Sequence, residues 1–305
     1  MITPYDTAWT RQFSGEAARV KEALGHLCLA LHHVGSTSVP GLWAKPVIDM
    51  ILIARDLEAI QAPLEALGYK AKGALNIPFR AYFSKDGVHL HAYAPDHPEI
   101  ALNLLFREYL RAHPDARDAY ARLKESLASQ RDTTQKTGLF SAYTLGKDAF
   151  IRGVLDKAGF DGVCLRVCTH TYEWERYHAL RKEHLFDRAG IVYDPNHPSL
   201  SDPNVTHFVL CKGTRIVTIA GIEFLDAREA ALRALVTDPA FQNQGYAGHM
   251  LALLERWTRE QGRRILKLHG WQDAVPFYRK RGYTDMDFDE GGVQSVRHVN
   301  LGKYL

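Results

Sequence analysis

A short segment of small and polar residues, Gln242 to Ala247, joins an apolar run to an apolar helical stretch. The run from Ala231 to Val236 predicts a strand, and the stretch from His249 to Trp257 predicts a helix. At such a junction the first backbone N–H groups of the helix have no partner within the helix. They can bind phosphate oxygens, and the small residues of the segment allow a diphosphate to approach the backbone closely.

A second pattern lies downstream, Phe277-Tyr278 followed by Gly282-Tyr283. The order Gln-x-x-Gly-x-Ala resembles the pyrophosphate loop of the GNAT acetyltransferases. The order Phe-Tyr-x-x-x-Gly-Tyr resembles the last helix of that family and the strand after it. The resemblance implies an N-acetyltransferase that uses acetyl-CoA.

The resemblance also implies roles for individual residues. The backbone N–H of Leu235 corresponds to the donor that contacts the acetyl carbonyl, and Thr237 to the position whose backbone meets the pantetheine arm. Tyr278 corresponds to the tyrosine that protonates the departing thiolate, for which a phenol is a suitable donor. The cofactor-binding residues implied in this way are Leu235, Val236, Thr237, Gln242, Asn243, Gln244, Gly245, Tyr246, Ala247, Gly248 and His249.

The sequence does not fix the general base. Some GNAT members carry a glutamate on the strand before the loop, at the position of Ala231 in this chain. Glu223, on the neighbouring predicted strand, is the catalytic candidate, and Glu229, His269 and a chain of waters are alternatives. Glu223 stands in an otherwise apolar run, where a solvent-facing role is equally compatible. Without a base, a C-terminal half that only binds CoA also stays open.

The first half carries a different pattern, beginning with His33 to Leu42 and Ala44 to Asp49. Together with later positions, these residues resemble the GrpB family, a branch of the polymerase-β-type nucleotidyltransferase superfamily. The later positions are Gly68-Tyr69, Arg80, His89-Leu90-His91, Phe106 to Leu110, Tyr120, Lys124, Tyr143 and Lys147. A Gly-Ser turn can hold a triphosphate, and an acidic residue on the next strand can hold Mg²⁺.

One departure from the superfamily pattern concerns metal. Active transferases place two carboxylates as Asp-x-Asp, whereas Asp49 is followed by Met50 and Ile51. Asp49 is therefore the one predicted metal ligand, which His89 and His91 could supplement. The predicted nucleotide or anion site comprises Gly35, Ser36, Lys45, Asp49, Arg80 and His91.

The fold class expected from these patterns is α+β, or mixed α-β, in two domains. Residues 1–158 form a GrpB-like domain with a nucleotidyltransferase-type mixed sheet and helices. Residues 162–305 form a GNAT domain, a mixed and mostly antiparallel sheet flanked by helices. The glycines at 159 and 162 mark the boundary. In the second half, helices are expected at 172–185, 246–261 and 273–280, and strands at 163–169, 207–211, 216–225, 231–236, 265–269 and 296–301.

Composition narrows the classes of partner. The net charge of +3 argues against a nucleic-acid or membrane surface. The N-terminus has neither a basic nor an apolar signal region, and the four cysteines suit a reducing compartment. We therefore expect a cytoplasmic protein. The resemblance to GNAT implies that the acceptor is a small-molecule or protein amine, bound by loops at 193–203 and 285–294.

The leading interpretation is an acetyl-CoA-dependent N-acetyltransferase fused to a GrpB-like domain. That domain would either bind a nucleotide or transfer a nucleotidyl group. If Asp49 binds Mg²⁺, the nucleotide would bind together with this ion. One alternative makes it a nucleotide-sensing module that regulates the acetyltransferase. Another makes the whole chain a bifunctional antibiotic-modifying enzyme.

Overall fold

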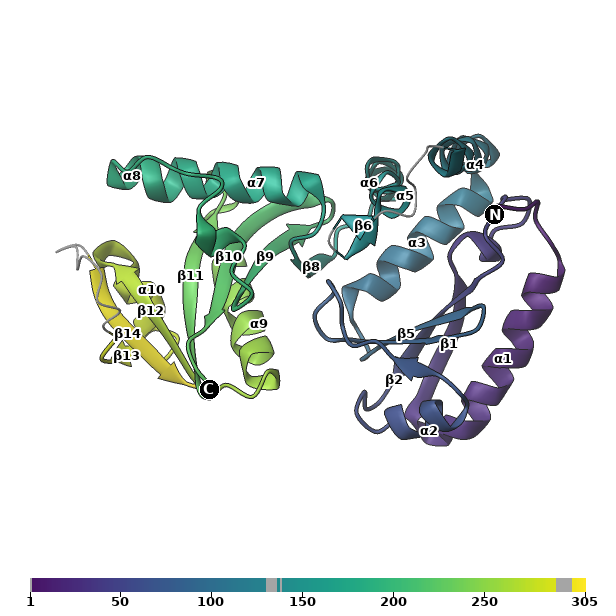
Figure 1. Cartoon of the computed structure of the whole chain (residues 1–305), viewed down its shortest axis with the longest axis horizontal. Coiled ribbons are helices and arrows are strands. Elements are labelled where there is room, and N and C mark those ends of the chain that lie inside the picture. Colours follow the sequence, from purple (N-terminus) through teal and green to yellow (C-terminus); the bar gives the residue numbers. More distant parts are fainter. Residues whose placement is uncertain (1, 130–135, 138, 289–297) are drawn as a thin grey trace. The chain divides into compact units, whose positions relative to one another are not determined.

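The computed structural model describes residues 2–129, 136–137, 139–288 and 298–305. It divides into two compact units, each with its own sheet. The first unit comprises Met1–Cys164 with the hairpin turn Lys212–Arg215, and the second comprises Leu165–Cys211 with Ile216–Leu305. Figure 1 labels most of the elements of both units.

The first unit is built on a five-stranded mixed sheet in the order β1-β2-β5-β4-β3. Its central strands, β2 and β5, run parallel, and the other neighbours run antiparallel. Alternate residues of β2 point to opposite faces. Met50 and Leu52 join the core formed with helix α1, and Ile51 packs with Ile100 and Leu104 of helix α3. The sheet thus carries a helix on each face.

The elements of the first unit have the following bounds. The helices are α1 Ala8–Leu24, α2 Gln61–Ala66, α3 Pro98–Ala112, α4 Pro114–Ser129, α5 Ala142–Leu145 and α6 Asp148–Lys157. The strands are β1 Cys28–Val34, β2 Ile48–Ala54, β3 Lys70–Ala71, β4 Arg80–Lys85 and β5 Val88–Tyr93, with a small pair β6 Lys136–Thr137 and β7 Phe140–Ser141.

The second unit contains a seven-stranded sheet in the order β13-β14-β12-β11-β10-β9-β8. The pair β11–β12 is parallel, whereas β10–β11, β12–β14 and β13–β14 are antiparallel. Helices α7 and α9 both pack against β11. The expected fold class, two domains of mixed α and β structure, is confirmed.

The elements of the second unit have the following bounds. The helices are α7 Thr171–Arg181, α8 Asp187–Ala189, α9 Tyr246–Glu260 and α10 Val275–Arg279. The strands are β8 Val163–Val167, β9 Val205–Lys212, β10 Arg215–Phe224, β11 Glu229–Thr237, β12 Ile265–Trp271, β13 Thr284–Asp285 and β14 His298–Tyr304.

These bounds agree with most of the expected elements, and one differs in kind. The helix expected at 172–185 ends at Arg181 and continues as a π-helical turn, Lys182–Phe186. Such turns are frequent at functional sites. Residues 296 and 297 of the expected last strand lie outside the described residues. No helix in the described part of the chain has the length and apolar character that a bilayer crossing requires.

Candidate functional site

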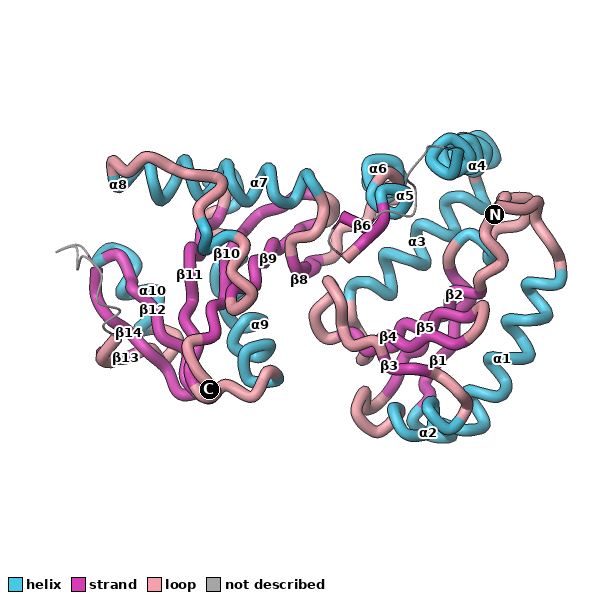
Figure 2. Tube along the Cα trace, in the orientation of Figure 1, coloured by secondary structure: helices cyan, strands magenta, loops and turns pink. Residues whose placement is uncertain are grey.

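Strands β11 and β12 are paired only at one end. Their register runs from Glu229–Ala231 against Ile265–Lys267 and goes no further, although both strands continue. Figure 2 shows the two strands diverging beyond the paired end. The backbone of β11 past Ala231 therefore has no ladder partner on the β12 side, and the gap can admit a ligand.

A β-bulge lies on β11 next to this gap. Ile219 and Gly221 of β10 pair with Val236 and Arg233, so Ala234 and Leu235 together oppose one residue. Ala234 has a φ of 53°, a left-handed value that alanine rarely adopts. A bulge interrupts the ladder and redirects the backbone, and bulges are common beside active sites. Leu235, the predicted carbonyl donor, lies at this irregularity.

The segment after β11 turns into helix α9 through Gly245, the N-cap residue. Gly245 has a φ of 88°, and no side chain caps the helix there. The side-chain amide of Gln242 donates from Nε2 to the backbone carbonyl of Thr237 at 3.2 Å, which connects the segment to the end of β11. The first N–H groups of α9 are thus left for an external anion, as the sequence predicted for a diphosphate.

Arg281 adds a positive charge beside this helix end. Its guanidinium lies 3.9 Å from the centre of the Phe277 ring and donates to the Phe277 carbonyl at 2.9 Å. A Cβ at position 248 would overlap Arg281, so Gly248 is needed for this close approach. The sequence reasoning missed Arg281, because only the packing of α9 against the residues after α10 brings it to Gly248.

Two cavities adjoin at this place. The loop cavity, about 520 Å³, lies at the N-terminus of α9, and the strand cavity, about 450 Å³, lies between β11 and β12. They share Leu235, Thr237, Gln242, Ala274 and Tyr278. Of the other predicted cofactor residues, Asn243, Gly245, Tyr246, Ala247 and Gly248 line the loop cavity, Val236 lines the strand cavity, and Gln244 and His249 line neither.

Tyr278 stands at the junction of the two cavities. Its side chain is 8% exposed and packs edge-on against Phe277 and Tyr283. Burial raises the pKa of the Tyr278 phenol, so the hydroxyl stays protonated through the neutral range. Within the described residues the hydroxyl has no hydrogen-bond partner. A ligand in either cavity can therefore accept a hydrogen bond from the Tyr278 hydroxyl.

The three candidate bases lie in different surroundings. The Glu223 carboxylate accepts from Arg233 Nε at 2.7 Å, and the Glu229 carboxylate pairs with Lys267 at 2.7 Å. Neither residue lines the loop cavity or the strand cavity. His269 lines the strand cavity, and its Nδ1 lies 2.9 Å from Asn300 Oδ1. Since Oδ1 can only accept, Nδ1 is the protonated nitrogen of this bond, and in the neutral ring the lone pair is then on Nε2.

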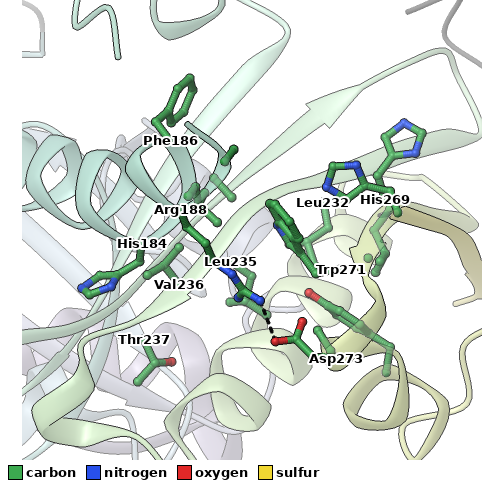
Figure 3. A pocket seen from close by; sticks show the side chains of 18 of the residues that line it. His184, Phe186, Arg188, Leu232, Leu235, Val236, Thr237, His269, Trp271 and Asp273 are labelled. Atoms are coloured by element: carbon green, nitrogen blue, oxygen red, sulfur yellow. Dashed lines mark hydrogen bonds and ion pairs between the residues drawn. The ribbon is translucent and has the colours of Figure 1, made fainter. Parts of the chain in front are cut away.

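The outer part of the strand cavity is formed by the π-helical turn and α8 (Figure 3). Arg188 stacks over Trp271 at 4.7 Å and donates to Asp273 at 2.7 Å. His184 and Phe186 complete this side. The expected acceptor loop at 193–203 does not line the cavity, and residues 289–294 of the other expected loop lie outside the described residues.

In the first unit, the predicted anion site gathers around Asp49. His89 Nδ1 lies 3.4 Å and His91 Nε2 4.0 Å from Asp49 Oδ1. Burial pushes the pKa of Asp49 upward, but hydrogen bonds from His89 and His91 outweigh it and lower that pKa to about 2. Arg80 Nη1 lies 3.5 Å from His91 Nδ1, and a Cβ at Gly35 would overlap the Asp49 carboxylate.

These residues do not fit a magnesium site. Mg²⁺ takes oxygen ligands in octahedral geometry, and the Asp49 carboxylate faces two imidazoles instead. Within the described residues, no group of three or more His, Cys, Asp or Glu side chains is arranged to hold a metal ion. The Asp49 carboxylate is thus surrounded by the nitrogen atoms of His89 and His91 rather than by the oxygen ligands of a metal ion.

Two lysines beside this site were not among the predicted site residues, although both belong to the GrpB pattern. Lys124, 2% exposed, donates from Nζ to Ser36 Oγ at 3.0 Å and also to the Trp43 carbonyl. Lys147 and the predicted Lys45 approach one ring, that of Tyr143, at 4.7 and 4.2 Å from its centre. Only the fold reveals that lysines so distant in sequence converge.

Comparison with known proteins assigns a family to each half. Residues 1–157 match the family model "GrpB protein", and residues 167–283 match "Acetyltransferase (GNAT) family". The UPF0157 protein YqkA of Bacillus subtilis is 39% identical over 164 residues, which cover 52% of this chain and 46% of YqkA. The chain thus spans less than half of the length of YqkA.

Solved structures resemble each half in turn. GrpB from Enterococcus faecalis is 36% identical and covers 52% of this chain and 96% of its own, with a TM-score of 0.46. An acetyltransferase of the GNAT family from Staphylococcus aureus Mu50 is 14% identical and covers 47% of this chain and 99% of its own, with a TM-score of 0.41.

Proposed function

Since the chain belongs to the GrpB family and also carries a GNAT acetyltransferase domain, we propose that it is an acetyl-CoA-dependent N-acetyltransferase. One observation carries the proposal. The loop cavity at the N-terminus of α9 adjoins the strand cavity between the diverging β11 and β12. Because the cavities share lining residues, one cofactor could place its diphosphate in the first and its thioester in the second.

The residues present fit acetyl-CoA. The N–H groups at the start of α9 would hold the diphosphate, and Arg281 would offset its charge. Gly248 keeps the helix end open, because a side chain there would displace the guanidinium. The bulged backbone at Leu235 would donate to the acetyl carbonyl and stabilise the negative charge that develops on its oxygen. Bound acetyl-CoA supplies an activated acyl group.

Acetyl transfer to an amine forms a C–N bond and breaks the C–S bond. In this transfer His269 Nε2 would accept the proton that the nitrogen loses, and the Tyr278 hydroxyl would donate a proton to the departing sulfur. Exchange of protons with solvent then restores both side chains. His269 is preferred over Glu223 because it lines the strand cavity, whereas Glu223 is paired with Arg233.

The amine acceptor, a small molecule or a protein side chain or terminus, would reach the strand cavity beside the π-helical turn. Asp273 at that rim is a carboxylate that an ammonium group could approach. Asp273 is also bonded to Arg188, so such an acceptor would compete with an existing pair.

Release of CoA thiol in the presence of a panel of amines tests the activity. We expect turnover with acetyl-CoA, and a loss of about a hundredfold or more in kcat for His269→Gln, the typical size of a general-base effect. Glu223→Gln should keep most of the turnover. The reverse pattern would assign the base to Glu223, and no thiol release with any amine would contradict the proposal.

For the GrpB half, a nucleotide-binding module that regulates the acetyltransferase is favoured over nucleotidyl transfer. Asp49 stands without a second carboxylate and faces His89 and His91, an arrangement unsuited to two-metal catalysis. A bifunctional antibiotic-modifying enzyme would instead need transfer by both halves. Saturating ATP should change the acetylation rate; an unchanged rate with ATP bound would contradict a regulatory role.

A further inference from the structure

Three lysines of the first unit form what we call the lysine cluster: Lys45, Lys124 and Lys147. Lys45 precedes β2, Lys124 belongs to α4, and Lys147 stands between α5 and α6. Lys45 and Lys147 both lie over the Tyr143 ring, and Lys124 lies over the Tyr120 ring at 4.8 Å. The fold thus brings together three ammonium groups that are far apart in sequence.

The cluster lacks the negative charge that would balance it. Within the described residues, none of the three lysines forms an ion pair with a carboxylate. Lys124 is held only by neutral oxygens, those of Ser36 and Trp43. An ammonium that is buried without a counter-charge destabilises a folded protein. Burial lowers the pKa of Lys124 to about 7, the nearby Lys147 adds to this shift, and the weaker effect of the Glu125 carboxylate opposes it.

Among the described residues, Asp49 is the acidic group that acts on Lys147, and its effect on the pKa of Lys147 is weaker than that of burial. Asp49 itself is engaged by His89 and His91. The site therefore has an excess of positive charge even when Asp49 is ionised, and a ligand with several negative charges would remove that excess.

Ser36 adds a directional donor next to the cluster. Its Oγ accepts from Lys124 Nζ, so its own hydroxyl proton is left to donate to a second oxygen. Gly35, with a φ of 68°, lets the backbone just before Ser36 pass against Asp49, because any side chain at 35 would overlap the carboxylate. One hydroxyl and three ammonium groups suit a chain of phosphates better than a single carboxylate.

We propose that the lysine cluster and Ser36 bind the polyphosphate part of a ligand without a divalent cation, the ammonium groups serving in place of the metal. The ligand is a nucleoside triphosphate or a free polyphosphate. This inference deepens the nucleotide-binding proposal for the GrpB half and rests on it only where the ligand is a nucleotide. It does not depend on acetyl transfer.

The test is calorimetric titration of the full chain with tripolyphosphate and with ATP, each in EDTA and in excess MgCl₂. The chain carries Ala247→Trp, which fills the loop cavity so that the phosphates cannot bind there. Variants Lys45→Met, Lys124→Met and Lys147→Met are compared with Lys70→Met, an exposed lysine on β3 of the same unit. Circular dichroism confirms that each variant is folded.

We expect tripolyphosphate to bind in EDTA, and affinity to fall about tenfold or more in each cluster variant but not in Lys70→Met. Lys45 is exposed, so Lys45→Met remains informative if Lys124→Met does not fold. Equal affinities for ATP and tripolyphosphate indicate a free polyphosphate ligand, and much tighter ATP binding indicates a nucleotide; both support the inference.

Two results would overturn it. Binding of ATP only in MgCl₂ would show that a metal is required, and would leave the nucleotide-binding proposal standing without this inference. Binding in EDTA that is unchanged in Lys45→Met and Lys147→Met would place the phosphates elsewhere. Absence of binding for both ligands under both conditions would end both proposals for this half.

Discussion

Tyr278 shows how much a single residue depends on where it is placed. Its phenol lines both cavities, while the neighbouring Phe277 lines only the loop cavity. A phenol that lines a cavity can donate its hydrogen bond to a ligand bound there. The position thus agrees with the role of proton donor to the departing sulfur.

Replacing this hydroxyl should affect turnover more than binding. We expect Tyr278→Phe to lower kcat about tenfold to a hundredfold, with little change in KM for acetyl-CoA, because the proton is needed only as the C–S bond breaks. Steady-state kinetics measure both constants. Tyr304→Phe, at a tyrosine that is 74% exposed, is the matched control. A normal kcat in Tyr278→Phe would remove it as the acid.

Among the helices and strands, sequence patterns predict those with periodic apolar residues and those that begin at a glycine. Apolar runs located β9 to β12, and the Gly245 segment located the start of α9. The bulge on β11 could not be predicted, because it rests on a left-handed φ at Ala234, and alanine gives no sign of that conformation. The π-helical turn after Arg181 could not be predicted either, because its residues follow the same sequence pattern as an ordinary α-helix.

The candidate site follows the same division. The loop-cavity residues Gln242, Asn243, Gly245, Tyr246, Ala247 and Gly248 belong to one contiguous segment and were predicted from it. Arg281, Lys124 and the outer wall at His184 and Arg188 were not, because each reaches its site through contacts between distant elements. The sequence offered both His269 and Glu223 as general bases, and only the structure shows that His269 lines the strand cavity whereas Glu223 does not.

At the scale of the whole molecule, each unit buries a neutral histidine. His33 is 7% exposed and accepts or donates a bond of 3.1 Å with Thr37, and His207 is 6% exposed and bonds the Tyr177 hydroxyl at 2.8 Å. Burial lowers the pKa of each to about 4. Both folds therefore favour the neutral ring over the charged one.

The consequence is a loss of stability in acid. A histidine whose pKa is lowered on folding stabilises the fold fully above its unfolded value of about 6.5, and that contribution is lost as pH falls toward 4. The size is roughly 2–3 kcal/mol at each site. We expect His207→Gln to lower the apparent Tm at about pH 7 while reducing its further fall at about pH 4.5.

Thermal unfolding of both proteins, followed by circular dichroism at the two pH values, measures this effect. The same fall in apparent Tm in His207→Gln and in the unchanged chain would show that His207 does not contribute to acid sensitivity.

The proposed function rests on the claim that the gap between β11 and β12, with the start of α9, binds acetyl-CoA. Calorimetric titration with acetyl-CoA tests it most directly, using the unchanged chain, Ala247→Trp and Ala252→Trp. Ala247 lines the loop cavity, and Ala252 is exposed further along the same helix. We predict micromolar binding in the unchanged chain and in Ala252→Trp, and its loss in Ala247→Trp. No binding in the unchanged chain, or equal binding in all three, would contradict the claim.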